Sequence, residues 1–287
     1  MAGISPHHPH SSETASNSGF TLIELSIVLV IIGLIVGGVL VGQDLIRAAE
    51  VRAQVSQIEK YNTAVNTFRV KFNALPGDMA LVTANQFGFI TDASCDGSTH
   101  GERDSDGMIE GGTTAVSYKQ ASYETGMFWQ DLSSNAGGNL IDGSFSGIVC
   151  GALGATVPGT GVGNYIPPAK LGKGMYVYVY TYLKYNWYGL SGVGGISTSG
   201  AFLPYSAPLT VIQAYNIDKK MDDALPTTGN VQALYLTGGP SNSVNNPLSG
   251  NPVDPTDCTD GSVTPNLYAI SVNNGTGSNC AISFRFQ

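Results

Sequence analysis

The stretch HGERDSDGMIEGG, residues 100–112, carries side chains that could bind a metal ion. Its acidic residues alternate, and Gly107 permits a sharp turn, as in the first half of an EF-hand calcium loop. The closing glutamate of such a loop is absent, because Thr113 stands in its place. An acidic turn without metal is the alternative, since Asp-Gly turns are common in loops. The expected calcium ligands are Glu102, Asp104, Asp106, the backbone carbonyl of Met108, and Glu110.

Catalytic chemistry has few side chains available in this chain. Three of the 4 histidines, His7, His8 and His10, lie at the N-terminus, and His100 is alone in the body of the protein. This distribution excludes a multi-histidine metal site, and a histidine-based triad could use only His100. The charged group at residues 218–223 could coordinate or catalyse, or it could be the solvated face of a helix. We therefore expect no enzymatic activity and no cofactor, with calcium as the one alternative.

The cysteines point to disulfide chemistry rather than to a metal site. The 4 cysteines, Cys95, Cys150, Cys258 and Cys280, are widely spaced and form no CxxC pair. Outside the cytoplasm an even number of cysteines indicates disulfides, and three pairings of these four are open. We favour Cys258 with Cys280 and Cys95 with Cys150, because shorter loops close at a lower entropic cost.

Composition and charge limit the class of protein. The charged fraction is 12%, about half of the usual globular share, and the chain contains 37 glycines. This composition suits a loop-rich extracellular β protein better than a cytosolic enzyme. The net charge is -8, so the chain offers no general electrostatic attraction for nucleic acid, and we expect no nucleic-acid partner.

A single carboxylate, Glu24, lies near the start of a long apolar run from Phe20 to Gly42. As a helix this run would be about 35 Å long, which matches the apolar core of a bilayer. A lone charge at the centre of such a helix costs roughly 2.5 to 3.5 kcal/mol, so it needs a partner or access to water. One local interpretation is a capping box, in which Thr21 caps the helix and Glu24 binds a free backbone N–H.

The heptapeptide GFTLIEL and its apolar continuation resemble the class III leader and N-terminal helix of type IV prepilins and type II secretion pseudopilins. In that family a prepilin peptidase cuts after a glycine, which maps onto Gly19, and methylates the new N-terminal residue, which maps onto Phe20. The family's assembly glutamate maps onto Glu24. The resemblance implies that Glu24 pairs with the new α-amine of a neighbouring subunit, so that two costly charges compensate each other in an apolar core.

Further elements must position these residues. An apolar stripe at helical spacing predicts that the N-terminal helix continues to Phe72, where the sequence NALPGD stops it. An anchor followed by an independent coiled coil is the alternative. The stripe consists of Val51, Val55, Ile58, Tyr61, Val65, Phe68 and Phe72.

The head contains predicted helices at Tyr123–Gly137 and Leu209–Gly229, the second broken at Pro226. The stretch Gly174–Gly189 alternates Tyr with Val and Thr, which predicts a strand. Its tyrosine row is either a half-buried face of a sheet or a stacking surface for a glycan or another filament. Further strands are predicted in NVQALYLTG, NLYAISVNNG and CAISFRFQ.

The predicted fold class is α+β and resembles that of type IV pilins. A long N-terminal helix, transmembrane in its first half and amphipathic in its second, packs on an antiparallel β-sheet head with loop insertions. The expected organisation is a leader at 1–19, a transmembrane or filament-core helix at 20–42, an amphipathic helix at 43–74 and an extracytoplasmic head at 75–287.

The resemblance implies a structural subunit of a type IV pilus or related filament, assembled through the apolar helix after leader cleavage. The implied partners are further copies in a homo-oligomeric helical filament, other pilins, the prepilin peptidase, membrane lipid before assembly, and an inner-membrane platform with its ATPase. The chain would cross the inner membrane once, and would then enter a cell-surface filament or a periplasmic pseudopilus. The alternatives are a pseudopilin of type II secretion and a minor pilin or anchored adhesin that binds a surface ligand.

Overall fold

A computed structural model describes residues 20–91, 103–112, 119–147, 155–201, 205–236, 244–245, 258–261 and 263–286. The chain divides into two units, Met1–Ile46 and Arg47–Gln287. The helices are α1 (Leu22–Phe72), α2 (Leu81–Phe87), α3 (Tyr123–Ser133), α4 (Val211–Met221) and the 3-10 helices η1 (Gly159–Asn164) and η2 (Asn273–Gly275). The strands are β1 (Val157–Pro158), β2 (Met175–Tyr182), β3 (Tyr185–Val193), β4 (Gly195–Ile196), β5 (Tyr205–Ser206), β6 (Leu209–Thr210), β7 (Val231–Gln232), β8 (Tyr235–Leu236), β9 (Val244–Asn245), β10 (Thr259–Asp260), β11 (Leu267–Tyr268), β12 (Ser278–Cys280) and β13 (Ile282–Arg285).

The first unit holds the apolar start of α1. Its large apolar side chains are exposed, from 51% at Ile31 to 90% at Leu22. The most apolar 18-residue window of α1 has a mean hydropathy of 2.9 and no buried residue. By length and composition α1 could cross a membrane. Apolar surface of this extent is unfavourable in water, so this part of α1 needs a covering by lipid or protein.

In the second unit α1 is amphipathic, as the stripe predicted. Val51, Ile58 and Phe68 are buried together with the rest of the stripe, except that Val55 is only half-buried. The helix ends at Phe72, and the next residue, Asn73, takes a left-handed conformation with φ 53°. The Pro-Gly turn that follows turns the chain away from the helix axis, which confirms the predicted stop.

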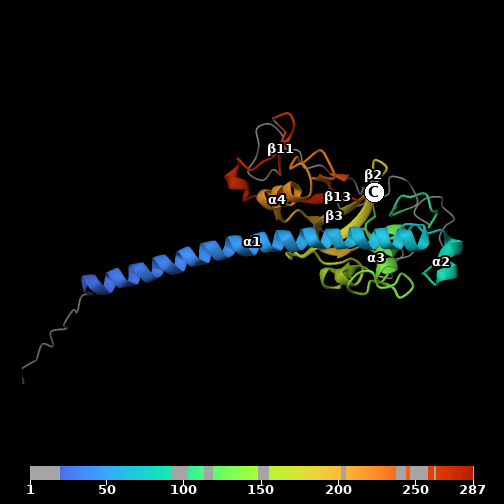
Figure 1. The fold of residues 1–287 in the computed structure, drawn as a ribbon, viewed down its shortest axis with the longest axis horizontal. Helices are drawn as coiled ribbons and strands as arrows, with labels where there is room; N and C mark the ends of the chain where they lie inside the picture. Colours follow the sequence, from blue (N-terminus) through green and yellow to red (C-terminus); the bar gives the residue numbers. More distant parts are fainter. Residues whose placement is uncertain are drawn as a thin grey trace, which may run out of the picture. The chain divides into compact units, whose positions relative to one another are not determined.

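The main sheet of the second unit is antiparallel, with strand order β2-β3-β13-β7 and with β5 also paired to β3. The β2–β3 hairpin turns at Leu183 and Lys184, both at positive φ, as a two-residue turn of this twist requires. Two-stranded ladders join β1 to β4, β6 to β12, β8 to β9 and β10 to β11. Figure 1 shows the later turns of α1 beside this sheet, with α3 next to them.

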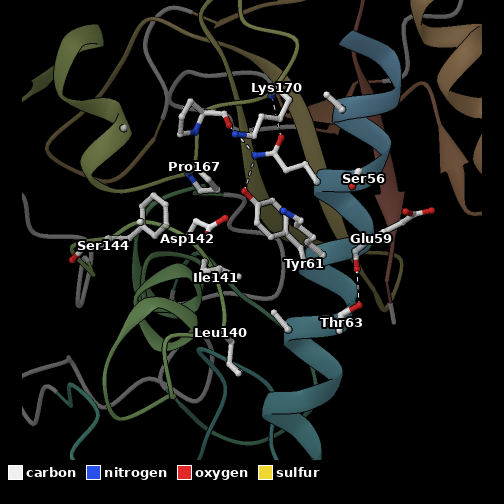
Figure 2. Close-up of a pocket in the computed structure, with 18 of the residues that line it drawn as sticks. Ser56, Glu59, Tyr61, Thr63, Leu140, Ile141, Asp142, Ser144, Pro167 and Lys170 are labelled. Atoms are coloured by element: carbon white, nitrogen blue, oxygen red, sulfur yellow. Dashed lines mark hydrogen bonds between the residues drawn. The ribbon is translucent and has the colours of Figure 1, made fainter. Parts of the chain in front are cut away.

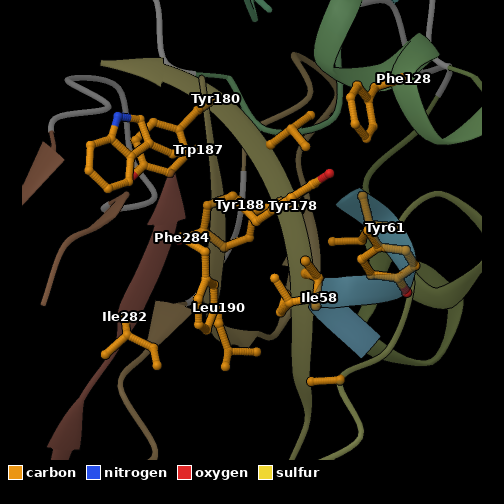
Figure 3. Packing of buried hydrophobic residues seen from close by; sticks show 14 of the residues in the cluster. Ile58, Tyr61, Phe128, Tyr178, Tyr180, Trp187, Tyr188, Leu190, Ile282 and Phe284 are labelled. Carbon is orange, nitrogen blue, oxygen red and sulfur yellow. The ribbon is translucent and has the colours of Figure 1, made fainter. Parts of the chain in front are cut away.

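Both faces of the sheet pack against other parts of the head. The tyrosine row of β2 covers the core, as the half-buried interpretation predicted: Tyr178 and Tyr180 are buried, and Tyr176 and Tyr182 are partly buried. On one face Val179 pairs with Tyr188, and the Tyr188 ring centroid lies 6.1 Å from that of Tyr61 in α1. On the other face Tyr178 and Tyr180 are 0% and 1% exposed. Figure 3 shows these rings within the buried cluster. Segments distant in the sequence cover the second face, which the alternation of residues within one strand does not reveal.

Hydrogen bonds show why these tyrosines belong to the core. The backbone N–H of Leu236 donates to the Tyr178 hydroxyl at 3.2 Å, and the Tyr180 hydroxyl donates to Ser283 at 2.8 Å. A Cβ atom at Gly189, opposite Tyr178, would lie only 2.2 Å from the tyrosine ring. Glycine at this position therefore makes room for the Tyr178 ring. The row is a packed layer and not an exposed stacking surface.

Helix α3 confirms the predicted short helix and its inward-facing rings, although it ends at Ser133 and not at the predicted Gly137. Phe128 and Trp129 are both 0% exposed. The ring of Trp129 meets that of Tyr61 edge-on, with centroids 4.8 Å apart. This contact adds to the area that the two rings bury, by about 0.5 to 1.5 kcal/mol in typical pairs. It fastens α3 to α1.

The C-terminal part of the head differs from the predicted elements in its boundaries. The predicted helix at Leu209–Gly229 is shorter, because Leu209 and Thr210 form β6 and α4 ends at Met221, before Pro226. A capping box between Thr210 and Gln213 starts α4. In their described residues, the strands of NVQALYLTG and NLYAISVNNG are two residues long, whereas β13 lies in CAISFRFQ as predicted.

The structure contains the favoured disulfide between Cys258 and Cys280, with Cα atoms 5.0 Å apart. It closes the loop that contains β10 and β11. The other favoured pair, Cys95 with Cys150, lies outside the described residues.

Candidate functional site

The start of α1 forms the capping box that the sequence predicted. The backbone N–H of Thr21 donates to Glu24 Oε2 at 2.8 Å, and the Thr21 hydroxyl donates to the same oxygen at 2.7 Å. In return, the N–H of Glu24 donates to Thr21 Oγ1 at 3.3 Å. These bonds satisfy donors that a helix start leaves free. Glu24 is exposed, so its carboxylate remains accessible to a further cation.

The predicted processing site lies at the edge of the described chain. Gly19 falls outside the described residues, and Phe20 is 89% exposed. Glu24 follows one helical turn after Phe20, so both lie in the same end of the apolar segment. Each chain can therefore present the Glu24 carboxylate to a neighbouring subunit and, after cleavage at Gly19, the α-amine of Phe20. The capping box can persist with such pairing, because a carboxylate accepts several hydrogen bonds.

In the acidic loop, two of the predicted ligands meet a third carboxylate that the sequence interpretation missed. One oxygen each of Asp78, Asp104 and Asp106 lie within 4.8 Å of one another. The N–H of Gly107 donates to Asp78 Oδ2 at 3.0 Å, and Gly107 has φ 90°, as the predicted sharp turn requires. Asp78 stands directly after the Pro-Gly turn that stops α1. A carboxylate directly after a Pro-Gly turn was the sequence signal that could have identified Asp78 as a member of the group.

The group of described carboxylates contains none of the other predicted calcium ligands. Glu102 is outside the described residues. Glu110 is not in the group with Asp78. It is buried, and its backbone N–H donates to the Glu124 carboxylate at 2.9 Å. The N–H of Met108 donates to Asp106 Oδ1 at 2.8 Å. Asp104 and Asp106 are therefore the predicted ligands that belong to the described carboxylate group.

Close backbone packing holds the turn that carries Asp78. A Cβ atom at Gly77 would lie 2.5 Å from the backbone oxygen of Glu124, and Gly77 has φ 85°. Both facts require glycine. The N–H of Gly77 donates to Asp131 Oδ2 at 2.7 Å, which ties the turn to α3. Local backbone constraints thus place Asp78 against the loop.

Burial gives this region unusual electrostatics. Burial raises the pKa of Asp78 to about 7. Backbone hydrogen bonds from Gly107 and Ser105 oppose this shift, and the charges of Asp106 and Asp104 add to it. Burial also raises the pKa of Glu124 well above its usual range, and the charge of Asp78 adds to that shift. Close carboxylates repel each other. Either a cation compensates their charges or one of them binds a proton.

A buried ion pair lies next to the acidic group. Arg103 donates from its two terminal nitrogens to the two oxygens of Asp131, at 2.9 and 2.7 Å. Its Nε donates to the carbonyl of Ile90 at 2.9 Å. Both charged side chains are 1% exposed. The sequence did not indicate this pair, because nothing local links a loop arginine to an aspartate within α3.

The second acidic group, at the end of α4, is bonded internally. Asp218 Oδ2 accepts from the Tyr268 hydroxyl at 2.8 Å, and its Oδ1 accepts from the N–H of Ala224 at 3.1 Å. Asp223 accepts from the N–H of Leu225 and from the hydroxyl of Thr228. Burial raises the pKa of Asp218 to about 7. These bonds indicate a structural role in closing the turn after α4.

A groove of about 970 Å³ lies along α1 in the second unit (Figure 2). The Gln57 amide donates to the Tyr61 hydroxyl at 2.7 Å and to the Pro168 carbonyl at 2.9 Å. Burial raises the pKa of Tyr61, and the charge of Asp142 adds to this effect, so the phenol stays protonated. Among the described residues that line the groove, none is a histidine or cysteine. The described lining therefore offers no histidine base and no cysteine nucleophile.

Comparison with known proteins adds one result. Residues 14–40 match the family described as the prokaryotic N-terminal methylation motif. No curated protein and no solved structure gave a significant match to the chain. The matched segment covers Phe20, Glu24 and the first turns of α1. The chain therefore carries the class III prepilin leader and N-terminal methylation motif that characterise type IV pilins and pseudopilins.

Proposed function

We propose that this chain is a structural, pilin-like subunit that assembles into a type IV pilus or related filament through its N-terminal helix. One observation carries the proposal: the methylation motif at residues 14–40 includes the first part of α1, which is apolar and exposed. Such a surface fits membrane anchoring of a pilin precursor. It can be covered first by lipid and then by the same helix of neighbouring copies.

The proposed sequence of events follows from the residues at the helix start. A prepilin peptidase cuts after Gly19 and methylates the amine of Phe20. Before assembly the chain crosses the inner membrane once, with its head on the extracytoplasmic side. An inner-membrane platform with its ATPase then moves the subunit into a filament with other pilins. Glu24 pairs with the α-amine of a neighbour, because either charge alone would be costly in an apolar core.

A pseudopilin of type II secretion shares the motif and is the second candidate. The two differ in the location of the filament, which is the cell surface for a pilus and the periplasm for a pseudopilus. The adhesin alternative has lost its strongest support, since Tyr178 and Tyr180 are buried. Their hydroxyls form hydrogen bonds with Leu236 and Ser283 inside the head. The rings of these two tyrosines are therefore not exposed for stacking.

Expression of the Glu24→Ala variant in the native host tests the proposal. The variant should still be cleaved and methylated, but its incorporation into filaments, measured by immunogold electron microscopy, should fall at least about tenfold, as loss of one partner of a buried charge pair requires. Glu59→Ala is the matched control, an exposed acid on the same helix, and should assemble normally. Normal assembly of Glu24→Ala, or filaments that retain residues 1–19 by mass spectrometry, would refute the proposal.

A further inference from the structure

Three carboxylates from two segments come together in the second unit beside the end of α1. The shared spacing of Asp78, Asp104 and Asp106, within 4.8 Å, has a direct meaning for metal binding. Two oxygens that each lie about 2.4 Å from one calcium ion can be at most about 4.8 Å apart. The spacing of the three carboxylates meets this condition for a shared ion.

Asp78 gives a second and independent indication of a ligand. The residue is 2% exposed, and its Oδ1 is a buried atom with no hydrogen-bond partner in the described part of the chain. Its other oxygen, Oδ2, binds the N–H of Gly107. A buried carboxylate oxygen without a partner is unfavourable, and such atoms are rare in folded proteins. A cation between the carboxylates would supply the missing partner.

The second acidic group provides an internal comparison. Asp218, Asp222 and Asp223 also have oxygens within 4.8 Å of one another. Both oxygens of Asp218 accept hydrogen bonds, as do both oxygens of Asp223. Spacing alone therefore does not separate the two groups. The buried oxygen of Asp78 separates them, because it has no hydrogen-bond donor in the described part of the chain. In the second group, backbone N–H groups and hydroxyls donate to Asp218 and Asp223.

The positions of the three residues also suit uptake of an ion from solution. Asp78 lies on the buried inner side, whereas Asp104 and Asp106 are exposed on the outer side. The nearest cation in the chain sequence, Arg103, is bound to both oxygens of Asp131. The guanidinium is thus committed to another carboxylate. Water has access to the outer side and can complete the coordination shell.

We propose that Asp78, Asp104 and Asp106 form a calcium site that fastens the loop at 103–112 to the turn after α1. Calcium suits an all-oxygen site of irregular geometry, because it accepts six to eight oxygen ligands. Magnesium requires near-octahedral geometry and gives up its water reluctantly, so it binds this site more weakly. Asp78 joins Asp104 and Asp106 only through space, so the ion links two segments of the head. The proposal is independent of filament assembly.

Isothermal titration of the full chain in detergent micelles with calcium chloride, after removal of metal, tests the site. We expect one saturable calcium per chain, with a dissociation constant roughly between 10⁻⁴ and 10⁻³ M, as in extracellular modules. The melting temperature should rise with calcium concentration. Asp78→Asn and Asp104→Asn should each weaken binding by at least about tenfold, because ligand charge sets the affinity. Asp223→Asn, from the second group, should bind calcium like the unmodified chain.

Several outcomes would overturn the site. These are the absence of saturable calcium binding, an unchanged affinity in both the Asp78 and Asp104 variants, and loss of binding in Asp223→Asn alone. Equal affinity for magnesium would also refute a calcium site. Near-UV circular dichroism reports whether each variant is folded. Asp104 is exposed, so Asp104→Asn tests the site even where a change at the buried Asp78 disturbs the fold.

Discussion

Replacement of Arg103 by Met should destabilise the head strongly. The side chain makes two hydrogen bonds to Asp131 and one to the Ile90 carbonyl, and it is almost fully buried. Its loss would leave the Asp131 carboxylate buried, with the N–H of Gly77 as its remaining hydrogen-bond donor in the described part of the chain. Loss of one partner of a buried ion pair costs about 3 to 5 kcal/mol. Typical domains are stable by about 5 to 15 kcal/mol, so this is a large fraction.

The assay is thermal unfolding of the purified chain in detergent, followed by near-UV circular dichroism. At about 2 to 4 °C per kcal/mol for a domain of 150 to 250 residues, the melting temperature should fall by about 6 to 20 °C. The double variant Arg103→Met with Asp131→Leu should recover most of this loss, since apolar pairs often replace buried ion pairs at little cost. The N–H of Gly77 would still lose its acceptor, which costs about 1 to 3 kcal/mol.

The double-mutant cycle decides whether the reasoning holds. The two single changes should be non-additive, with a coupling free energy of at least about 2 kcal/mol. A single-variant loss below about 1 kcal/mol would mean that water reaches the pair and that its burial has been overestimated. Additive single and double losses would mean that each residue acts through its own packing and not through the shared hydrogen bonds.

Two further predictions concern the turns that shape the head. Gly77→Ala should reduce the free energy of unfolding by about 2 kcal/mol or more, because Gly77 has φ 85° and a Cβ would lie 2.5 Å from the Glu124 oxygen. Urea titration measures this loss. The control is Gly88→Ala, at φ 76° with no atom within 4 Å in the described chain, which should cost only about 1 kcal/mol. Equal losses in the two variants would contradict the steric argument. Burial raises the pKa of Asp218 to about 7, above its usual value of 3.8, so its contribution to stability is present at acidic pH and is lost as pH rises through about 7. The melting temperature of Asp218→Asn should therefore gain on that of the unmodified chain between about pH 4 and pH 8, and parallel pH profiles would contradict the shift.

The N-terminal part of this protein could be interpreted from its sequence because its structure depends on neighbouring residues. The capping box joins Thr21 to Glu24 within one turn, and the buried stripe from Val51 to Phe72 repeats with the helical period. Both follow from residues three or four positions apart. The stop at the Pro-Gly turn after Phe72 is equally local. The methylation motif is likewise local, because it is defined by the order of residues in one short segment.

The tertiary structure decided which distant residues meet. Asp78 joins Asp104 and Asp106 because α3 holds the turn at Gly77 through Asp131, and no spacing in the sequence encodes that contact. Likewise, alternation placed the tyrosines of β2 on one face, but only the chain packed over that face decided that Tyr178 and Tyr180 are fully buried. Periodicity fixes the direction of a side chain relative to its own helix or strand, whereas burial and charge depend on what folds against it.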